Sequence, residues 1–162
     1  MRTIIQRVLE ASVTVDGSII SSIGPGLVCL IGIHESDSAA DADFIISKIM
    51  GAKLFEDDQR RPWRQSVVAK GHGVLLVSQF TLYGSFAKGN KPDLHRAMPP
   101  GPAKALYETF LAAARAAVLP PGGDDAAARE KVKDGVFGAN MQVALVNDGP
   151  VTMLLDSQDR KG

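Results

Sequence analysis

The stretch NDGPVT, residues 147–152, joins two apolar runs near the C-terminal end, residues 141–146 and 151–155. Apolar runs on either side of such a segment predict two β-strands that meet at a tight turn. Gly149 can adopt backbone angles that other residues avoid. The bond before Pro150 has an accessible cis form, which costs about 0.5–1 kcal/mol for X-Pro and about 3–4 kcal/mol for other residues. A cis bond would point two neighbouring carbonyl oxygens the same way as a rigid polar probe, whereas a plain hairpin turn is the simpler interpretation of the dipeptide alone.

The N-terminal part of the chain has the pattern of a β-sheet. Residues 2–9 and 11–16 are rich in Ile, Val and Thr, and they lead into an Asp-Gly pair at residues 16–17, which is a strong hairpin signal. A return strand is expected over residues 19–23. Residues 27–33 form a continuous apolar run, which predicts a strand buried on both faces.

Two helices are expected to pack on this sheet. The first covers residues 38–50, where Ser36 or Asp37 can cap the N-terminus. The second begins near Pro102, a residue type that suits the first turn of a helix. The apolar residues of each helix fall on one face: Phe44, Ile45, Ile46 and Ile49 in the first, and Leu106, Tyr107, Phe110, Leu111 and Ala114 in the second.

The remaining segments complete a single domain over residues 1–162, because neither a repeat nor a domain boundary is visible. The expected fold is mixed α/β, with a mostly antiparallel or mixed, barrel-like sheet and two packing helices. The segments are a short strand at 53–55, a charged loop at 56–65, a strand over 67–81 with a turn at 71–73, a polar loop at 84–100 and a mobile insertion at 119–134.

The composition limits where the protein acts and what it binds. The formal net charge is zero, so any contact with nucleic acid must be a local patch. Cys29 is the only cysteine, lies in an apolar run and is expected to pack rather than react. No apolar run approaches the roughly 20 residues of a membrane helix, and the N-terminus lacks the pattern of a signal peptide. We expect a cytoplasmic protein with no membrane contact.

The side-chain machinery of common hydrolases is missing from the sequence. There is no Gly-x-Ser-x-Gly elbow, no Cys-x-x-Cys pair and no His-Glu-x-x-His motif. His34, His72 and His95 lie in separate contexts without partners at metal-ligand spacing. The sequence therefore predicts neither a metal nor any other cofactor.

Four separated motifs nevertheless point to one family. They are SQFT at residues 78–81, GPVT at 149–152, GVFGANM at 135–141 and IQRV at 5–8. In their order along the chain, at residues 5–8, 78–81, 135–141 and 149–152, they resemble the motifs of the D-aminoacyl-tRNA deacylases, and the resemblance runs through nearly the whole chain. It implies the deacylase fold, a homodimer and D-aminoacyl-tRNA as the substrate.

The resemblance also implies roles for individual residues. Ser78, Gln79, Phe80 and Thr81 would form the catalytic stretch, whose backbone acts together with the terminal ribose hydroxyl of the tRNA. Gly149 and Pro150 would enter the site of the partner subunit, held in place by Arg7. The backbone around four further residues would hold the terminal adenosine: Phe137, Gly138, Ala139 and Met141.

Backbone chemistry is sufficient for this reaction. An aminoacyl ester is already activated, and its transition state mainly needs an oxyanion stabilised by N–H donors. A strand that breaks its ladder at Phe80 and Thr81 can offer two such donors, each of which contributes about 10²–10³ in rate. Thr81 as a nucleophile is an alternative, but the sequence shows no neighbouring base.

Selection by chirality has a physical basis as well. In a fixed pose, the Cα hydrogen and the side chain exchange places between D- and L-residues. A rigid carbonyl from Gly149-Pro150 would accept the hydrogen of a D-residue and collide with the Cβ of an L-residue. Rejection by 10⁴ needs about 5.5 kcal/mol, which a forced clash can supply. Glycyl-tRNA has no Cβ and is an expected second substrate.

Two other functions remain open. A relative with a trans Gly149-Pro150 bond would admit L-residues on mischarged tRNA. A catalytically inert module would bind tRNA ends without cleaving the ester. The residues that would contact acceptor-stem phosphates are also open, between two basic sets: Lys88, Lys91 and Arg96, or Arg60, Arg61 and Arg64.

Overall fold

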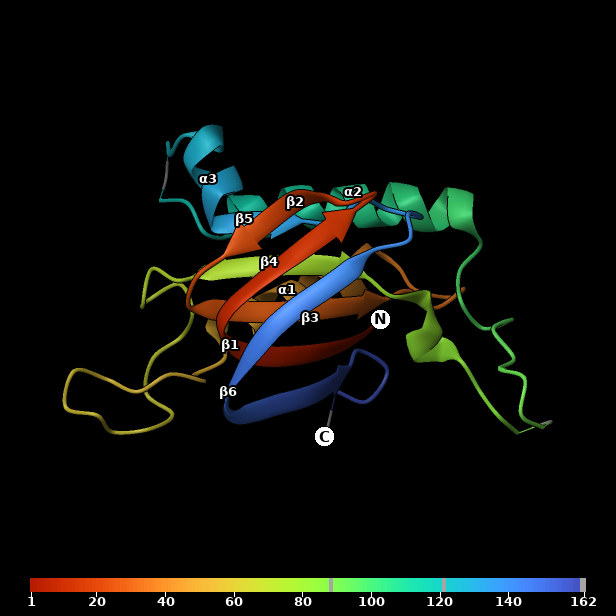
Figure 1. The fold of residues 1–162 in the computed structure, drawn as a ribbon, viewed down its shortest axis with the longest axis horizontal. Helices are drawn as coiled ribbons and strands as arrows, with labels where there is room; N and C mark the ends of the chain where they lie inside the picture. Colours follow the sequence, from red (N-terminus) through yellow and green to blue (C-terminus); the bar gives the residue numbers. More distant parts are fainter. Residues whose placement is uncertain (88, 121, 161–162) are drawn as a thin grey trace.

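The computed structural model describes residues 1–87, 89–120 and 122–160, and its sheet is built around the long first strand (Figure 1). The strands of this part of the chain are β1 (Arg2–Val15), β2 (Ser18–Ile23), β3 (Gly26–Gly32), β4 (Gly73–Ser78), β5 (Val132–Asp134) and β6 (Gln142–Asp156). Its helices are α1 (Ala39–Gly51), the 3-10 helix η1 (Phe80–Tyr83), α2 (Pro100–Ala116) and α3 (Asp125–Lys131).

β1 is antiparallel to three other strands. Its first half pairs with β3, its second half pairs with β2, and β6 pairs along its opposite edge. The hairpin between β1 and β2 turns at Asp16 and Gly17, whose φ angles of 48° and 77° both lie in the left-handed region. An Asp-Gly pair favours this turn, so the hairpin predicted from the sequence is confirmed.

The sheet then nearly closes on itself. β4 runs parallel to β3, and β5 runs parallel to β4, which gives the order β2-β1-β3-β4-β5 with β6 attached to β1. The Ser21 hydroxyl in β2 donates a hydrogen bond to the Asp134 carbonyl in β5, so the two ends of this path meet. The predicted mixed α/β fold with a barrel-like sheet is confirmed.

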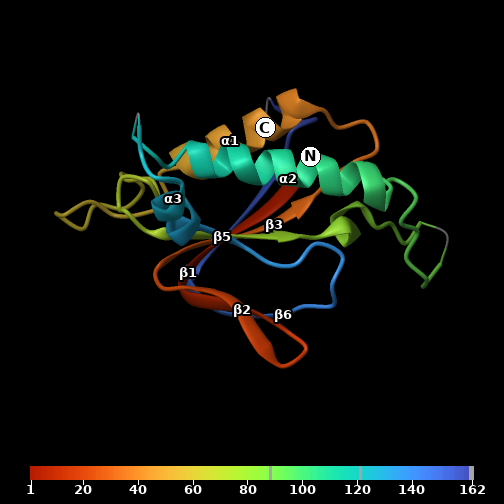
Figure 2. The same cartoon turned by 90° about the horizontal axis from the view of Figure 1, so that it is seen from above.

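Helices α1 and α2 lie side by side on one face of the sheet (Figure 2). Side chains of β3 alternate between this helical layer and the interior of the curved sheet. Leu27, Cys29 and Ile31 pack in the cluster that contains the helices, whereas Val28 packs in the cluster that contains Val13. The prediction that this strand is buried on both faces is therefore confirmed.

The strand expected over residues 67–81 is shorter than predicted. Residues 67–71 form turns, β4 covers only residues 73–78, and the chain then enters η1. No strand forms at residues 53–55, where a single bridge joins Phe55 to Gln65. Apolar residues suggested a strand in both segments. A strand forms, however, only where a neighbouring strand is available to pair with it.

Residues 119–134, which we expected as a mobile insertion, contain α3 and β5 in their described part. Asp124 caps α3 by accepting a hydrogen bond from the Ala126 N–H at 3.1 Å. Ala128 and Val132 are fully buried. A third, short α-helix therefore adds to the two that the sequence predicted, and Pro121 lies outside the described residues.

The segment at residues 147–152 is not a hairpin turn between two strands, as we had predicted. β6 runs antiparallel to β1 through this segment, and both strands bend together (Figure 1). Gln6 pairs with Thr152 and Val8 pairs with Asn147, so residues 148–151 stand opposite Arg7 alone. The segment is a large bulge that projects from a continuous strand, because β1 is long enough to pair with both apolar runs.

In the described part of the chain, none of the helices has the length and apolar character needed to span a membrane.

Candidate active site

A mostly apolar cavity of about 470 Å³ opens where β3 and β4 end and α2 begins. Ser78, Gln79 and Phe80 line it on one side, and Phe137 and Gly138 line it on another. The structure thus brings together two motifs that are more than fifty residues apart in the sequence. A cavity of this size, with few polar groups, is typical of a small-molecule site.

The polar edge of this cavity is the backbone at the start of η1. The Gln79 N–H donates to the Ile31 carbonyl at 2.7 Å, after which the chain leaves the sheet. The first N–H groups of a helix have no partner within it. Among the backbone hydrogen bonds of the described residues, none comes from the N–H of Phe80 or Thr81. These two adjacent donors therefore have no backbone partner in the described part of the chain. Phe80 lines the cavity, whereas Thr81, the next residue, is not among the residues that line it.

Thr81 has a neighbour that cannot activate it. The Gln79 side-chain amide donates to the Thr81 hydroxyl at 2.5 Å. An amide has no basic nitrogen, so it cannot take a proton from a nucleophile. The contact orients the hydroxyl and supports a positioning role for Thr81 over a nucleophilic one.

The four residues expected near the adenosine fall into two groups. Phe137 and Gly138 line the cavity, and the Phe137 ring packs 5.7 Å from the Tyr107 ring, centroid to centroid. Ala139 and Met141 are not among the residues that line it. Met141 packs instead against the core cluster inside the curved sheet.

Arg7 and Gly149 meet in the bulge of β6. The Arg7 Nε lies 2.9 Å from Asp148 Oδ2, and its Nη1 donates to the Leu54 carbonyl at 2.6 Å. Gly149 has a φ of 121°, and a Cβ built there would lie 2.7 Å from Val151 Cγ2 and 3.2 Å from Arg7 Nη2. Glycine is therefore required at this position. The bond between Gly149 and Pro150 is cis.

Asn147 closes the base of the bulge, a role that the sequence analysis missed. Its side-chain Nδ2 donates to the Arg7 carbonyl at 2.8 Å and to the Val151 carbonyl at 3.0 Å. One amide therefore joins β1 to both sides of the bulge. The available signal was an asparagine directly before Asp-Gly-Pro, since its two N–H donors suit such a bridge.

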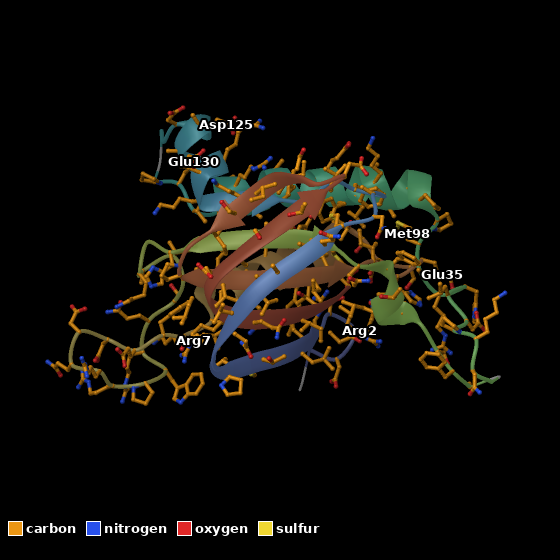
Figure 3. The ribbon with its side chains drawn as sticks, viewed as in Figure 1. Arg2, Arg7, Glu35, Met98, Asp125 and Glu130 are labelled. Atoms are coloured by element: carbon orange, nitrogen blue, oxygen red, sulfur yellow. The ribbon has the colours of Figure 1, made fainter. Side chains whose placement is uncertain are left out.

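The cavity and the bulge lie apart in one chain. Arg7 and Met98, which lines the cavity, lie toward opposite ends of the long axis of the molecule (Figure 3). Neither Gly149 nor Pro150 lines the cavity. The structure therefore divides the residues expected at the site into one group at η1 and another around Arg7.

The wall of the cavity also contains apolar residues of a loop, which the sequence analysis did not predict as part of the site. Leu94, Ala97 and Met98 come from the polar loop before α2 and line the cavity. Met98 is fixed by its N–H, which donates to the Ile33 carbonyl at 2.9 Å. The signal that the sequence offered was the recurrence of apolar residues within an otherwise polar loop.

None of the described residues that line the cavity has a titratable side chain. Burial raises the pKa of the Cys29 thiol far above its usual value. The pKa of His72 is lowered by burial and by the charges of Lys70 and Lys131. In the portion that the structure describes, no group of three His, Cys, Asp or Glu side chains is placed to hold a metal ion.

The basic residues considered for tRNA contact are not equivalent. Arg61 is paired with Asp57 at 2.7 Å. Arg96 lines a separate cavity of about 400 Å³, together with Tyr83 of η1. Lys88 lies outside the described residues. The choice between the two sets therefore remains a prediction.

Comparison with known proteins identifies the family. The family model described as D-Tyr-tRNA(Tyr) deacylase matches residues 4–156. A D-aminoacyl-tRNA deacylase of Yarrowia lipolytica is 49% identical over 162 residues, covering 99% of this chain and 100% of the relative. D-aminoacyl-tRNA deacylase 1 of Bos taurus is 46% identical over 157 residues, which cover 97% of this chain and 70% of the relative.

Solved structures share the fold. One described as c-Myc DNA Unwinding Element Binding Protein has a TM-score of 0.86 and 44% identity, with 96% of this chain and 98% of that chain covered. Another, of a probable eukaryotic D-amino acid tRNA deacylase, has a TM-score of 0.77 at 18% identity, with 95% and 97% covered. The family model and the curated relatives show that the chain belongs to the D-Tyr-tRNA(Tyr) deacylase family and is a hydrolase.

Proposed function

We propose that the protein hydrolyses the ester bond of D-aminoacyl-tRNA and releases the D-amino acid and free tRNA. The observation that carries this proposal is the pair of adjacent N–H groups, of Phe80 and Thr81, that have no backbone partner among the described residues at the point where Phe80 lines an apolar cavity. The family and its curated relatives, which are named D-aminoacyl-tRNA deacylases, support the substrate class. This substrate connects the reaction with translation and thus with the cytoplasm.

The reaction needs no side-chain nucleophile. The oxygen of a water molecule adds to the ester carbonyl carbon, and the carbonyl oxygen becomes an oxyanion that accepts hydrogen bonds from the Phe80 and Thr81 N–H groups. The bond between that carbon and the ribose oxygen then breaks, and the ribose oxygen takes up the proton that the water has lost. The neighbouring ribose hydroxyl of the substrate assists this transfer.

The terminal adenosine would occupy the cavity between η1 and residues 137–138. Gly138 has a φ of 78°, and no atom lies within 4 Å of a Cβ built on it. The absence of a side chain leaves room for a nucleoside close to the backbone. Phe137, which rests on Tyr107, offers an aromatic surface next to it.

The bulge of β6 would act as the chirality filter in the site of a second copy. Support for a cross-subunit filter comes from the separation of Gly149 and Pro150 from the cavity of their own chain. Asp148 and Asn147 tie the bulge to Arg7, which gives the carbonyls the rigidity that rejection requires. The proposal therefore includes a homodimer, and glycyl-tRNA, which lacks a Cβ, would pass the filter.

The test is deacylation of D-Tyr-tRNA and L-Tyr-tRNA by the purified protein, side by side and in the presence of a chelator. We expect loss of the D-ester alone. Loss of the L-ester as well would favour a relative that admits L-residues. Binding of tRNA with no loss of either ester would favour an inert module and would overturn the proposal.

A further inference from the structure

Arg2 joins three elements at the η1 end of the molecule, where Met98 also lies (Figure 3). Its Nη1 donates to the Leu82 carbonyl in η1 at 2.9 Å. Its Nε and Nη2 lie 3.0 Å and 2.9 Å from Asp156 Oδ2 in β6. Its guanidinium carbon lies 4.8 Å from the centre of the Tyr83 ring. One side chain of β1 thus contacts both η1 and β6.

These contacts depend on the planar shape of the arginine side chain. The guanidinium is a planar fork with donors that point in fixed directions, and it stacks on aromatic rings. A lysine ammonium carries the same charge but is a compact point that cannot span the carboxylate and the carbonyl in this way. The geometry at Arg2 therefore depends on the fork and not only on the charge.

The element that Arg2 holds is weak by itself. η1 has four residues, and the hydrogen bonds of a 3-10 helix have poorer geometry than those of an α-helix. The residue before it, Gln79, donates its N–H to the Ile31 carbonyl, but within the described ranges the N–H groups of Phe80 and Thr81 have no backbone partner that would hold them. On the side facing β3, a Cβ on Gly32 would lie 2.9 Å from the Leu82 Cβ, so glycine allows Leu82 to approach the strand.

The end of η1 is where Arg2 acts. Leu82 contributes the carbonyl that Arg2 binds, and buried Tyr83 contributes the ring beneath the guanidinium. Both residues belong to the same single turn as Phe80 and Thr81. A shift at one end of so short a helix therefore moves the N–H groups at the other end.

We propose that Arg2, anchored by Asp156, is a positioning residue that aims the free N–H groups of η1 at the substrate carbonyl. The inference rests on the proposed function, because aiming matters only if those donors stabilise an oxyanion. Arg2 does not line the cavity beside Phe80, although it lines the separate cavity that contains Arg96. We expect its effect in the chemical step, because its contacts are with η1.

The experiment compares Arg2→Lys with Arg160→Lys by single-turnover and steady-state deacylation of D-Tyr-tRNA. Arg160 is a matched control, because it also pairs with an aspartate, Asp41 at 3.4 Å, and lies over a ring, Phe44 at 5.0 Å, but it does not touch η1. Asp156→Asn serves as a second variant that removes the anchoring charge and keeps the shape of the side chain. All assays are run well below each variant's Tm.

We expect kcat to fall about tenfold in Arg2→Lys, which is a fraction of the about 10²–10³ that loss of a whole donor costs. KM should stay within about twofold of wild type, since only an interaction made in the transition state is weakened. The kcat of Asp156→Asn should also fall, and the kcat of Arg160→Lys should match that of wild type. An unchanged kcat in folded Arg2→Lys, or an equal loss in Arg160→Lys, would overturn the inference.

Amide hydrogen exchange gives a readout that needs no substrate. The Gly84 N–H donates to the Thr81 carbonyl at 2.9 Å and reports on the end of η1. We expect faster exchange of this amide in Arg2→Lys than in Arg160→Lys, and equal rates would contradict the positioning of η1. If wild-type protein cleaves no D-ester, the proposed function fails by itself, and this exchange comparison alone decides whether Arg2 holds the helix.

Discussion

The side-chain amide of Asn147 donates a hydrogen bond to the backbone carbonyl of Arg7 at 2.8 Å, across the two longest strands of the sheet. The same nitrogen also donates to the Val151 carbonyl at 3.0 Å. The bulge that carries Gly149 and Pro150 is therefore closed at its base by one side chain. Arg7 contributes its backbone to this closure and its guanidinium to the Asp148 pair.

Replacement of Asn147 by aspartate should destabilise the protein. The change removes both donors and places a carboxylate against two carbonyl oxygens. An unsatisfied buried polar group costs about 1–3 kcal/mol, and because Asn147 is half-buried we expect a loss toward the lower end of that range. Urea unfolding at neutral pH measures the loss. Asn90→Asp is the control, because Asn90 lies exposed in the polar loop. Equal stability of the two variants would show that the Asn147 bridge contributes nothing.

Phe80→Pro should lower kcat for D-Tyr-tRNA by about 10²–10³, the usual cost of one lost oxyanion donor. Proline has no N–H, yet it is tolerated at the first position of a helix, which Phe80 occupies in η1. Phe80→Ala is the matched control, because it removes the exposed ring and keeps the N–H. Similar rates for the two variants would mean that this donor does not act on the oxyanion.

Gly149→Ala should reduce discrimination between D- and L-esters. The added Cβ would meet Val151 and the left-handed φ strains the new residue, so the bulge must shift. Since a misplacement of about 1 Å can cost about 10²-fold, we expect the D/L ratio of kcat/KM to fall by about that factor. Gly17→Ala has the same kind of φ but open space around its Cβ, and it should leave the ratio unchanged.

Asp41 should contribute to the pH dependence of stability. Burial raises its pKa, but hydrogen bonds from the Ser38 N–H and hydroxyl outweigh burial and lower the pKa to about 2, from 3.8. A pKa lowered in the folded state means stability that is present above pH 4 and is lost as the pH falls toward 2. The difference between the pKa values of Asp41 in the unfolded and the folded state corresponds to about 2 kcal/mol in the free energy of unfolding.

Urea unfolding at pH 5 and at pH 2.5 tests this contribution. Asp41→Asn should flatten the change in the free energy of unfolding between the two pH values. Asp43→Asn, at an exposed position of the same helix, should retain the wild-type change. If the free energy of unfolding of Asp41→Asn changes between the two pH values as much as that of wild type, Asp41 is not the source of the change.

The elements with a strong local pattern were predictable. The Asp-Gly hairpin and α1 follow from turn chemistry and helical periodicity, and the apolar run of β3 follows from burial on both faces. Each of these depends on residues that are neighbours in the sequence. The third helix has only seven residues and too short an apolar pattern to be recognised.

The parts that were not predictable depend on distant pairing. Residues 147–152 form a bulge and not a turn because β1 pairs with both sides of them. Residues 80–83 leave the sheet although their side chains suit a strand, and Arg2, almost eighty residues earlier, holds them. The family motifs predicted which residues belong to the site, and the separation of Arg7 from the cavity could be seen only in the fold (Figure 3).

The most direct test of a site shared between two chains uses mixed dimers of Phe80→Pro and Gly149→Ala, each with its own tag and isolated by two affinity steps. The working cavity then belongs to the Gly149→Ala chain, and the intact bulge belongs to the Phe80→Pro chain. If the filter acts across subunits, the mixed dimer hydrolyses D-Tyr-tRNA and regains rejection of L-Tyr-tRNA, unlike the Gly149→Ala homodimer. The contrary result is that the mixed dimer hydrolyses L-Tyr-tRNA as fast as the Gly149→Ala homodimer does, when each rate is divided by the number of working cavities. That result would contradict a filter that acts across subunits.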